Sequence, residues 1–376
     1  MMDYDIAICG AGPAGMALAA LLAERGVPAS RMVLVDAKPL EQSLQDPRTL
    51  ALSYGSRQIL ESIGAWPIHA TAINEIHVSR RGQFGRSMIT SEEQNVPALG
   101  YVARYGAIVE VLSAVCARHR IASLRPVRVT GMDQAADCVT LHLEGEGPQV
   151  LRAGIVVQAE GGLFGEQAVK AEHRDYQQTA IIAQVRSSAP VARRAYERFT
   201  SEGPLALLPQ DDEYAMVWCV RPGTAASLLA LDDAAFLARL GDTFGQRVGS
   251  FTHASRRLAF PLGLNAGVTG SERTVAIGNA AQTLHPVAGQ GLNLGLRDAA
   301  ELARQLAQAA TPEALARFAE RRRNDRKLTV RLTDTMARVF ANDSPAQALL
   351  GLSLAAIDMA SPARALLAEL MMYGRR

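Results

Sequence analysis

Cysteine is scarce in this sequence of 376 residues, which holds only four, and no two of them form a Cys-x-x-Cys pair. Their scatter excludes a cysteine-based zinc site and a redox-active dithiol, and it is typical of reduced cytosolic thiols. No two histidines have a metal-ligand spacing such as HExxH, so no metal site is predicted. The four cysteines are Cys9, Cys116, Cys138 and Cys219.

An excess of charge of one sign is also missing. The chain has 39 Lys and Arg against 37 Asp and Glu, a formal net charge of +2. A nucleic-acid binder would concentrate basic charge far more strongly on one element. The single strongly basic stretch, residues 321–331 (RRRNDRKLTVR), is interpreted as a solvated helix face. No nucleic-acid partner is therefore predicted.

Long hydrophobic runs are absent as well. No window reaches the ~18 uninterrupted apolar residues that would span a bilayer, and the longest candidate, near the C-terminus, is broken by Asp358. The N-terminal run carries Asp3 and Asp5 where a signal peptide would carry positive charge. These features predict a cytoplasmic protein that is soluble or peripheral to the inner face of the cell membrane.

The chain does have enough apolar mass for a large core. Hydrophobic residues make up 48% of it and charged residues 20%, the balance of a soluble globular protein. Its length exceeds the size at which a single hydrophobic core usually stops growing. Two closely packed lobes that can enclose a large cofactor are therefore predicted.

A glycine motif lies between predicted strand and helix near the N-terminus. Residues 4–9 indicate a short strand, 16–25 a helix and 32–35 a second strand, so the three form a parallel βαβ unit. The intervening turn, GAGPAG at 10–15, has the GxGxxG spacing, and Asp36 ends the second strand. Such a turn brings backbone N–H groups to a pyrophosphate, and the acid can bind a ribose diol. A dinucleotide site is predicted, either for NAD or for FAD.

The middle of the chain changes pattern and then returns to the first one. Helical composition at 106–118 is followed by short alternating runs that indicate antiparallel strands, and 155–159 resumes a buried strand. From 179 to 260 the pattern is strand-like, which predicts a second lobe. A buried strand at 274–277 and a helical repeat at 292–309 then return the chain to the first lobe.

A second ligand-binding segment is predicted at residues 274–299, where strand, glycine turn, proline bend and long helix follow one another. A helix opening near Gly291 would direct its positive end at whatever lies beside Gly289. The negative pyrimidine edge of a reduced flavin suits that position. Pro286 has no N–H and can line a flat apolar ring without requiring a hydrogen-bond partner.

The two segments together resemble the paired FAD motifs of class A flavoprotein aromatic hydroxylases, through GAGPAG with Asp36 and through GNAAQTLHPVAGQGLNLG at 278–295. DPRTLALSYGS at 46–56, ERFTSEGPLALLP at 197–209 and NAAQ at 279–282 are similar to the hydroxylases of ubiquinone biosynthesis. The resemblance covers nearly the whole chain. The FAD-binding residues expected on its basis are Gly10, Gly12, Pro13, Ala14, Gly15, Asp36, Arg48, Gly278, Asn279, Pro286, Gly289, Gly291, Leu292 and Asn293.

The resemblance also implies a fold and a reaction. The fold is α/β with an α+β second lobe: a Rossmann-like FAD-binding domain, an interleaved and mainly antiparallel β-sheet substrate domain, and a C-terminal helical region. NADH or NADPH would reduce FAD, O2 would add to form a flavin hydroperoxide, and the ring of a polyprenylated phenol would take the oxygen. The expected domains are residues 1–70, 98–175 and 262–335 for FAD, 71–97 and 176–261 for substrate, and 336–376 for the helical region.

Three positions depart from the family pattern. Asn279 stands where the broad family has Asp, a change that the ubiquinone branch often shares. Glu160 and Gly161 open a segment that replaces the Asp-Gly motif associated with nicotinamide use, and Tyr105 stands where a polar residue is common. The altered segment leaves the choice between NADH and NADPH open. The ring position, the prenyl length and the oligomeric state cannot be predicted from one sequence, because the shape of the pocket sets them.

Several alternatives remain at this stage. His285 is a candidate for taking or relaying a phenolic proton, or it is simply satisfied by hydrogen bonds near the bend. The apolar helical region at 346–372 could rest on a membrane or a partner protein, form a homodimer face, or pack on the FAD lobe. The competing functions are another FAD-dependent oxidoreductase, such as a prenyl-chain reductase or a halogenase, and a non-catalytic FAD-binding scaffold of the biosynthetic complex.

Overall fold

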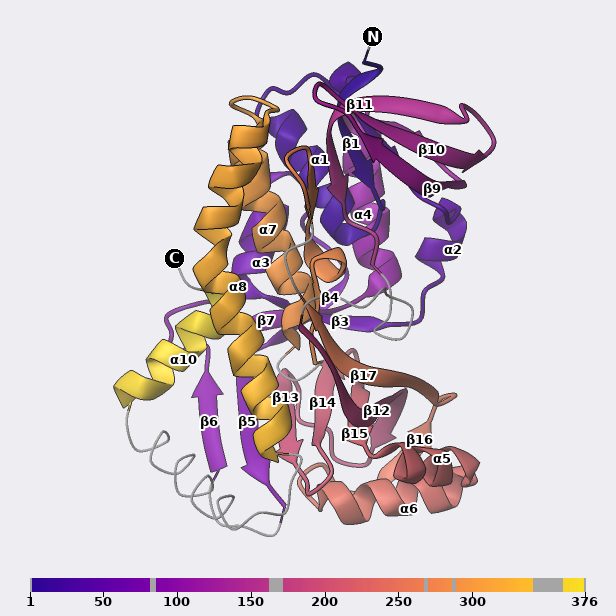
Figure 1. The fold of residues 1–376 in the computed structure, drawn as a ribbon. Helices are drawn as coiled ribbons and strands as arrows, with labels where there is room; N and C mark the ends of the chain where they lie inside the picture. The colour runs from indigo at the N-terminus through magenta and orange to yellow at the C-terminus, as the bar shows by residue number, and fades with distance from the viewer. Residues whose placement is uncertain are drawn as a thin grey trace.

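The computed structural model describes residues 2–81, 86–161, 172–266, 270–285, 289–340 and 361–374. The chain forms two lobes, with a mixed sheet in one and a larger, mainly antiparallel sheet in the other (Figure 1). A small third sheet lies between them, and helix α8 runs along one side of both lobes (Figure 1). This arrangement confirms the predicted α/β fold with an α+β second lobe.

The first sheet is built on the predicted parallel unit. Strands β1 and β2 pair in parallel, with Ile6 opposite Met32, and α1 connects them. The strand order is β8-β2-β1-β11-β10-β9, with β18 also paired to β11. The bounds are β1 (Tyr4–Cys9), α1 (Pro13–Glu24), β2 (Met32–Val35), β8 (Ala122–Leu124), β9 (Val127–Gln134), β10 (Val139–Gly145), β11 (Val150–Gln158) and β18 (Thr274–Ala276).

Both faces of this sheet are covered, which explains why its central strands are apolar throughout. Ile6 and Ile8 of β1 pack with α1, α4 (Tyr105–Arg118) and α7 (Gln290–Leu306) on one face. Ala7 and Cys9 point the other way and pack against Val139 of the antiparallel strands β9 and β10. The sheet therefore holds the end of β1 rigidly at the point where the glycine turn begins.

The second sheet has nine strands in the order β19-β17-β12-β15-β14-β13-β5-β6, with β16 paired to β12. Its strands come from three separate stretches of the chain, 75–90, 172–266 and 282–283, and the β13–β5 pair that joins the first two is parallel. The bounds are β5 (Glu75–Arg80), β6 (Arg86–Thr90), β12 (Glu172–Ser187), β13 (Arg194–Phe199), β14 (Pro204–Gln210), β15 (Glu213–Val220), β16 (Phe251–Ala254), β17 (Leu258–Ala266) and β19 (Gln282–Thr283).

The strand-like interpretation of residues 179–260 was incomplete. Helices α5 (Pro222–Ala230) and α6 (Asp233–Phe244) lie within that stretch and cover one face of the second sheet. Asp232 caps α6 by accepting a hydrogen bond from the backbone N–H of Ala235. Phe236 and Phe244 then pack on this face of the sheet. The opposite face is left to line the space between the lobes.

Short elements complete the junction between the lobes. The three-stranded sheet β3-β7-β4 is antiparallel, and Val102 of β7 packs with Ala195 of β13. The bounds of these elements are η1 (Ala29–Arg31), α2 (Leu40–Leu44), β3 (Thr49–Ser53), α3 (Tyr54–Ser62), β4 (Ala70–Ile73), β7 (Gly100–Arg104) and η3 (Gly278–Ala280).

Two helices end the described chain, α8 (Pro312–Phe340) and α10 (Ser361–Tyr373). Pro362 lies in the first turn of α10, where its missing N–H costs no hydrogen bond. Within the described part of the chain, no helix is long and apolar enough to cross a membrane.

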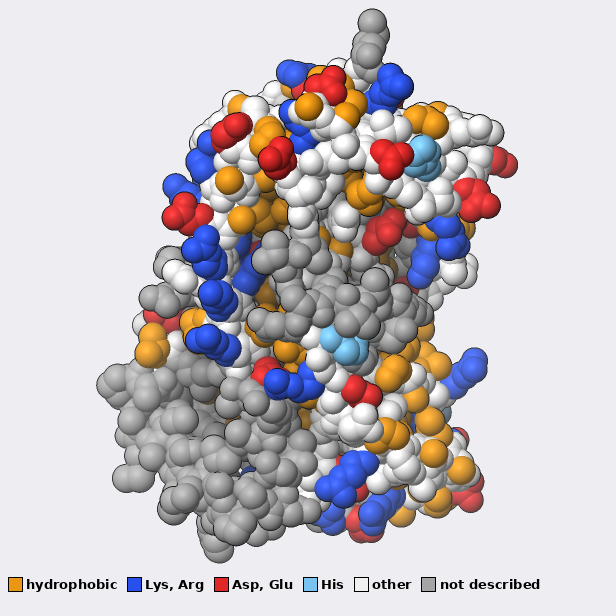
Figure 2. All heavy atoms as spheres, viewed as in Figure 1, with side chains coloured by type: hydrophobic (Ala, Val, Ile, Leu, Met, Phe, Trp, Pro, Cys, Tyr) orange, Lys and Arg blue, Asp and Glu red, His pale blue; other side chains and the backbone are white. Residues whose placement is uncertain are grey.

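The basic stretch at 321–331 is only partly the solvated face that was expected. Figure 2 shows basic side chains along α8, and Arg321, Arg323 and Lys327 are exposed. Arg322, in contrast, is buried and its Nε donates to Asp298 of α7 at 2.7 Å. The stretch therefore docks α8 on α7 as well as meeting solvent.

Candidate active site

A cavity of about 980 Å³ lies between the two lobes. Its wall includes the glycine turn after β1, strand β3, the inner face of the second sheet, the start of α7 and residues of α10. Its volume is at the upper end of the ~300–1,000 Å³ that ligand sites usually occupy. The cavity joins both predicted FAD segments and the second lobe in one space.

The glycine turn supplies the first helix end that faces the cavity. Gly10 has a φ of +104°, and a Cβ there would lie 2.5 Å from the backbone of Ala159 and Glu160. Gly12 is the N-cap of α1 and makes no side-chain cap, so the first N–H groups of this helix are left for a ligand. Gly12, Pro13 and Ala14 line the cavity.

Gly15 has a different place from the other glycines of this turn. A Cβ on Gly15 would lie 1.9 Å from the carbonyl oxygen of Gly10, so only glycine allows α1 to pack this closely on the turn. Gly15 does not line the cavity. We therefore interpret it as a packing residue of the motif.

Asp36 faces the cavity from the end of β2 and also holds the glycine turn. Its Oδ2 accepts a hydrogen bond from the backbone N–H of Ala11 at 2.6 Å, and its Oδ1 accepts one from Lys38 at 2.8 Å. The Nη2 of Arg125 lies 3.6 Å from Oδ2. A carboxylate has about four lone-pair positions, so Asp36 can hold the turn and still accept hydrogen bonds from a ribose diol.

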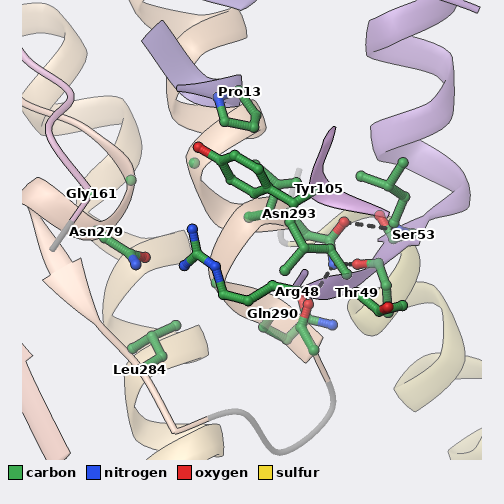
Figure 3. Close-up of a pocket in the computed structure, with 18 of the residues that line it drawn as sticks. Pro13, Arg48, Thr49, Ser53, Tyr105, Gly161, Asn279, Leu284, Gln290 and Asn293 are labelled. Carbon is green, nitrogen blue, oxygen red and sulfur yellow. Dashed lines mark hydrogen bonds between the residues drawn. The ribbon is translucent and has the colours of Figure 1, made fainter. Parts of the chain in front are cut away.

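The start of α7 supplies the second helix end. Gly289 is its N-cap in the left-handed conformation, with a φ of +59°, and no side chain caps the helix. The buried amide of Asn293 fixes this end, because its Nδ2 donates to the carbonyl oxygens of Ala51 and Gly289. Its Oδ1 accepts from the backbone N–H of Ser53 at 2.8 Å (Figure 3). It also accepts from Ser56 Oγ at 2.7 Å.

The remaining residues expected in this segment gather at the same wall. Gly278, Asn279, Gly289, Gly291, Leu292 and Asn293 all line the cavity. Pro286 lies outside the described residues. The glycine turn at 10–15 and the segment at 278–295, which are more than 260 positions apart in the sequence, thus line one space.

Arg48 and Tyr105 form a stacked pair in the cavity (Figure 3). The guanidinium carbon of Arg48 lies 4.7 Å from the centre of the Tyr105 ring, within cation–π range. Asp46 orients the arginine by accepting from Nε at 2.9 Å and from Nη2 at 2.7 Å. Burial raises the pKa of Asp46, but its hydrogen bonds with Arg48 outweigh burial and hold that pKa below its usual value.

Glu160 and Gly161 line the cavity beside the glycine turn. Burial, and then the negative charge of Asp36, raise the pKa of Glu160 above its usual value. The remainder of the departing segment, from Gly162 onward, lies outside the described residues. The part that is described therefore stands at the dinucleotide end of the cavity.

His285 lies at the cavity and is 1% exposed. One hydrogen bond joins its Nε2 to Oε1 of Gln178 at 3.0 Å, and its ring meets Tyr176 edge to face. Since an amide oxygen only accepts, Nε2 carries the proton. Burial lowers the pKa of His285 to about 4, so the imidazole is neutral near pH 7 and is a weak base. These contacts favour a hydrogen-bonding role over proton abstraction.

The second sheet contributes an apolar wall with one acidic residue that sequence reasoning missed. Glu197 of β13 lines the cavity, and its buried Oε1 has no hydrogen-bond partner among the described residues. Burial raises its pKa to about 7. The alternation of Ala195, Glu197 and Phe199 along β13 was the available signal, since it puts an acid on the same face as apolar residues.

The donor set and shape of the cavity fit FAD. Two uncapped helix N-termini suit the pyrophosphate and the negative pyrimidine edge of a flavin, respectively. Asp36 suits the ribose, and apolar residues such as Leu284 and Leu292 offer a surface for a flat ring system. Among the described residues, no three His, Cys, Asp or Glu side chains are grouped as metal ligands.

Comparisons with known proteins agree with this geometry. Residues 3–333 match the family model described as an FAD binding domain. The chain is 31% identical to the ubiquinone hydroxylase UbiL of Rhodospirillum rubrum, over 96% of this chain and 88% of that protein. It is 29% identical to the 3-demethoxyubiquinol 3-hydroxylase of Escherichia coli, over 91% of each. The structure of p-nitrophenol 4-monooxygenase from Pseudomonas putida has the same fold, with a TM-score of 0.77 at 17% identity over both full chains.

Proposed function

This chain belongs to the family of FAD-dependent aromatic hydroxylases, and from that membership we propose that it hydroxylates the ring of a polyprenylated phenol in ubiquinone biosynthesis. The observation that carries the proposal is a single cavity in which two uncapped helix ends face an apolar sheet. The helix ends suit a flavin dinucleotide. The apolar sheet suits a hydrophobic phenol, and NAD(P)H is the reductant typical of the family.

The residues of this chain divide between holding the cofactor and shaping the space beside it. Gly10, Gly12 and Asp36 would hold the dinucleotide, while Gly291 and Asn293 would hold the flavin end. The bound flavin supplies the oxygen-activating chemistry. The N–H groups at the start of α7 would direct a partial positive charge at a bound flavin, which would favour its negatively charged reduced form.

The second lobe would exclude water and orient the phenol. Ile76, Val78 and Leu208 present apolar side chains to the cavity, and Met372 contributes from α10. These apolar side chains would keep water out of the space beside a bound flavin. Holding the ring close to the flavin in a fixed orientation supplies much of the remaining rate acceleration.

The visible spectrum of the purified protein is the first test. We expect flavin absorption bands, and in an anaerobic NAD(P)H titration we expect them to bleach faster when a prenylated phenol is present. Under air, the product should be the phenol with one added hydroxyl. Flavin that bleaches at the same rate without phenol would favour another oxidoreductase, flavin that never bleaches would favour a scaffold, and no flavin after reconstitution would overturn the proposal.

We also propose that α10 contacts the membrane from which a prenylated phenol would be delivered. Leu366 of this helix is 68% exposed, while Ala368, Met371 and Met372 on the same helix line the cavity. An exposed leucine beside a cavity wall suits a peripheral contact with lipid. Flotation with liposomes should carry the protein, and Leu366→Ser should reduce the bound fraction; a doubled mass in lipid-free light scattering would instead favour a homodimer.

A further inference from the structure

The inner face of the second sheet can be read row by row from its strand register. The first row, next to the junction of the lobes, runs Ile89, Ile76, Ala195 and Leu208 across β6, β5, β13 and β14. The next row runs Ser87, Val78, Glu197, Ala206 and Val217, and continues onto β15. Every residue of both rows lines the cavity. These two rows are apolar except at Ser87 and Glu197.

Among the described residues, no side chain on this face donates a hydrogen bond to Glu197 Oε1. Val78 and Ala206 flank it on the adjacent strands, and both are apolar. Ser87 is two strands away, roughly 10 Å at the ~4.8 Å spacing of paired strands, which is too far for a hydrogen bond. Arg198, the next residue along β13, points to the opposite face and donates to the carbonyl oxygen of Thr243.

A buried carboxyl oxygen without a partner is costly unless a ligand supplies one. Glu197 lies about 7 Å, or two residues along the strand, beyond Ala195 at the junction of the lobes. A phenol ring that stands over the apolar first row would therefore bring an oxygen substituent to the second row. Glu197 therefore lies at the depth in the cavity that the oxygen substituent of such a ring would reach.

We propose that Glu197 is the residue that binds the ring hydroxyl of the phenol, by accepting its hydrogen bond, and so fixes which ring edge is turned toward the flavin. This inference rests on the proposed function. Apolar contacts bind the ring and the prenyl chain but do not fix the orientation of the ring. A single hydrogen-bond acceptor at a fixed depth gives the ring one preferred orientation. Glu197 is thus a specificity-determining residue of the cavity.

The charge state of Glu197 suits this role. Burial raises its pKa to about 7, and no charged residue of β6 or β14 shares its face of the sheet. Arg80 of β5 does share that face, opposite Phe199 and diagonal to Glu197. From β15 it faces the Cys219 thiol, whose pKa is raised by burial first and by Glu197 second, so that the thiol stays neutral. The carboxylate therefore forms near neutral pH, and it then needs the proton donor that a phenol provides.

The test compares ortho-farnesylphenol with its methyl ether, which cannot donate a hydrogen bond. Both bind to the oxidised, FAD-loaded enzyme without reductant, and the change in the flavin spectrum gives each Kd. We expect the wild-type protein to bind the phenol about 10- to 100-fold more tightly than the ether, the range for a hydrogen bond to a charged group. Glu197→Gln and Glu197→Leu should reduce that ratio to about threefold or less.

Glu213→Gln is the matched control, because Glu213 lies on the same sheet and pairs with the exposed Arg186. It should keep the wild-type ratio and FAD content. If the Glu197 variants keep the ratio as well, or if the wild-type protein shows no preference for the phenol, the inference is overturned. A wild-type protein that binds neither compound and hydroxylates no phenol would instead overturn the proposed function.

A second measurement uses only the wild-type protein, so it tests the inference even if neither Glu197 variant folds. In the wild-type protein the ratio of the two Kd values should rise several-fold from about pH 6 to about pH 8, because the carboxylate forms across that interval. The phenol itself titrates well above this range. A ratio that is flat across it overturns the inference.

Discussion

Glu197 brings a cost in stability, because the folded protein holds its carboxyl in a place that disfavours the charge. The pKa is 4.5 without the fold and about 7 within it. The contribution of this group to the free energy of unfolding is fully present below pH 4.5 and is lost as the pH rises through 7. Glu197→Gln should therefore raise the free energy of unfolding at pH 8 by about 3 kcal/mol, measured by chemical denaturation. An unchanged or lower value at pH 8 would show that the carboxylate is already compensated within the protein.

His285 makes the stability of the protein fall at acidic pH, whereas Glu197 makes it fall at alkaline pH. Burial lowers its pKa from 6.5 to about 4. The unfolded chain binds the proton more readily, so the stability contribution is present above pH 6.5 and is lost as the pH falls toward 4. At pH 5 the loss should be about 2 kcal/mol. Denaturation curves at pH 7 and pH 5 should show that His285→Gln removes part of this loss, while the exposed His253→Gln does not.

At the scale of single residues, the sequence predicted what depends on local backbone geometry. The dinucleotide-binding role of the glycine turn and Asp36 could be predicted because strand, turn, helix and acid follow one another within 33 positions. Glu197 was not, because alternation along a strand shows which residues share a face but not whether that face meets a cavity or a core. The role considered for His285 depended in the same way on its burial, which only the packing of Tyr176 and Gln178 around it decides.

At the scale of elements, α7 and α8 are joined by a buried ion-pair cluster. Asp298 of α7 is 0% exposed and accepts from Arg322 Nε at 2.7 Å and from Arg326 Nη2 at 2.8 Å. Burial raises the pKa of Asp298, but the charges of Arg326 and Arg322 outweigh it and hold that pKa below its usual value. The cluster anchors the helix whose first turn faces the flavin end of the cavity.

Asp298→Asn should destabilise the protein by about 3–5 kcal/mol, because it removes a buried counter-charge from the partly buried Arg326 and leaves the buried Arg322 with Asp325 alone. FAD affinity should fall with it, since the start of α7 loses its anchor. Thermal unfolding with and without added FAD measures both effects. The matched control is Asp212→Asn in an exposed turn, which should stay within about 0.5 kcal/mol of the wild-type protein. Equal stability of the two variants would contradict the anchoring role.

The elements themselves were largely predictable, and the exceptions have physical causes. The apolar strands and α7 carry strong periodicity, so the sequence located them to within a few residues. The helices α5 and α6 were missed because they lie between strands of one antiparallel sheet, where the strand pattern dominated the interpretation. Arg322 was expected in solvent because its partner, Asp298, lies on another helix 24 positions away.

At the scale of the whole molecule, α10 closes the cavity against α3 and α7. The Nε2 of Gln290 donates to the carbonyl oxygen of Met371 at 3.3 Å, and the rings of Tyr54 and Tyr373 meet edge to face. Gly55 permits this contact, since a Cβ there would lie 2.6 Å from the carbonyl oxygen of Met372. The sequence left packing on the FAD lobe open as one alternative for this apolar region, but no pattern in it indicated a contact with the cavity.

Gly55→Ala should therefore displace α10 and let water reach the flavin. We expect a larger share of the consumed NAD(P)H to appear as hydrogen peroxide instead of hydroxylated phenol, measured by comparing peroxide with product. Gly223→Ala in α5 is the matched control, because a Cβ there would meet nothing within 4 Å. If both variants couple reductant to product as well as the wild-type protein, α10 is not a seal.

The cavity also lies along the seam between the two lobes, so the surfaces that would bind FAD are among those that hold the lobes together. A ligand at a thousand times its Kd stabilises a protein by about 4 kcal/mol, a large part of an ordinary domain's total stability. We therefore expect the lifetime of this chain in a cell to depend on flavin supply. A shortage of flavin would leave more chains without this stabilisation, so that the number of enzyme molecules would fall while each loaded molecule would work as before.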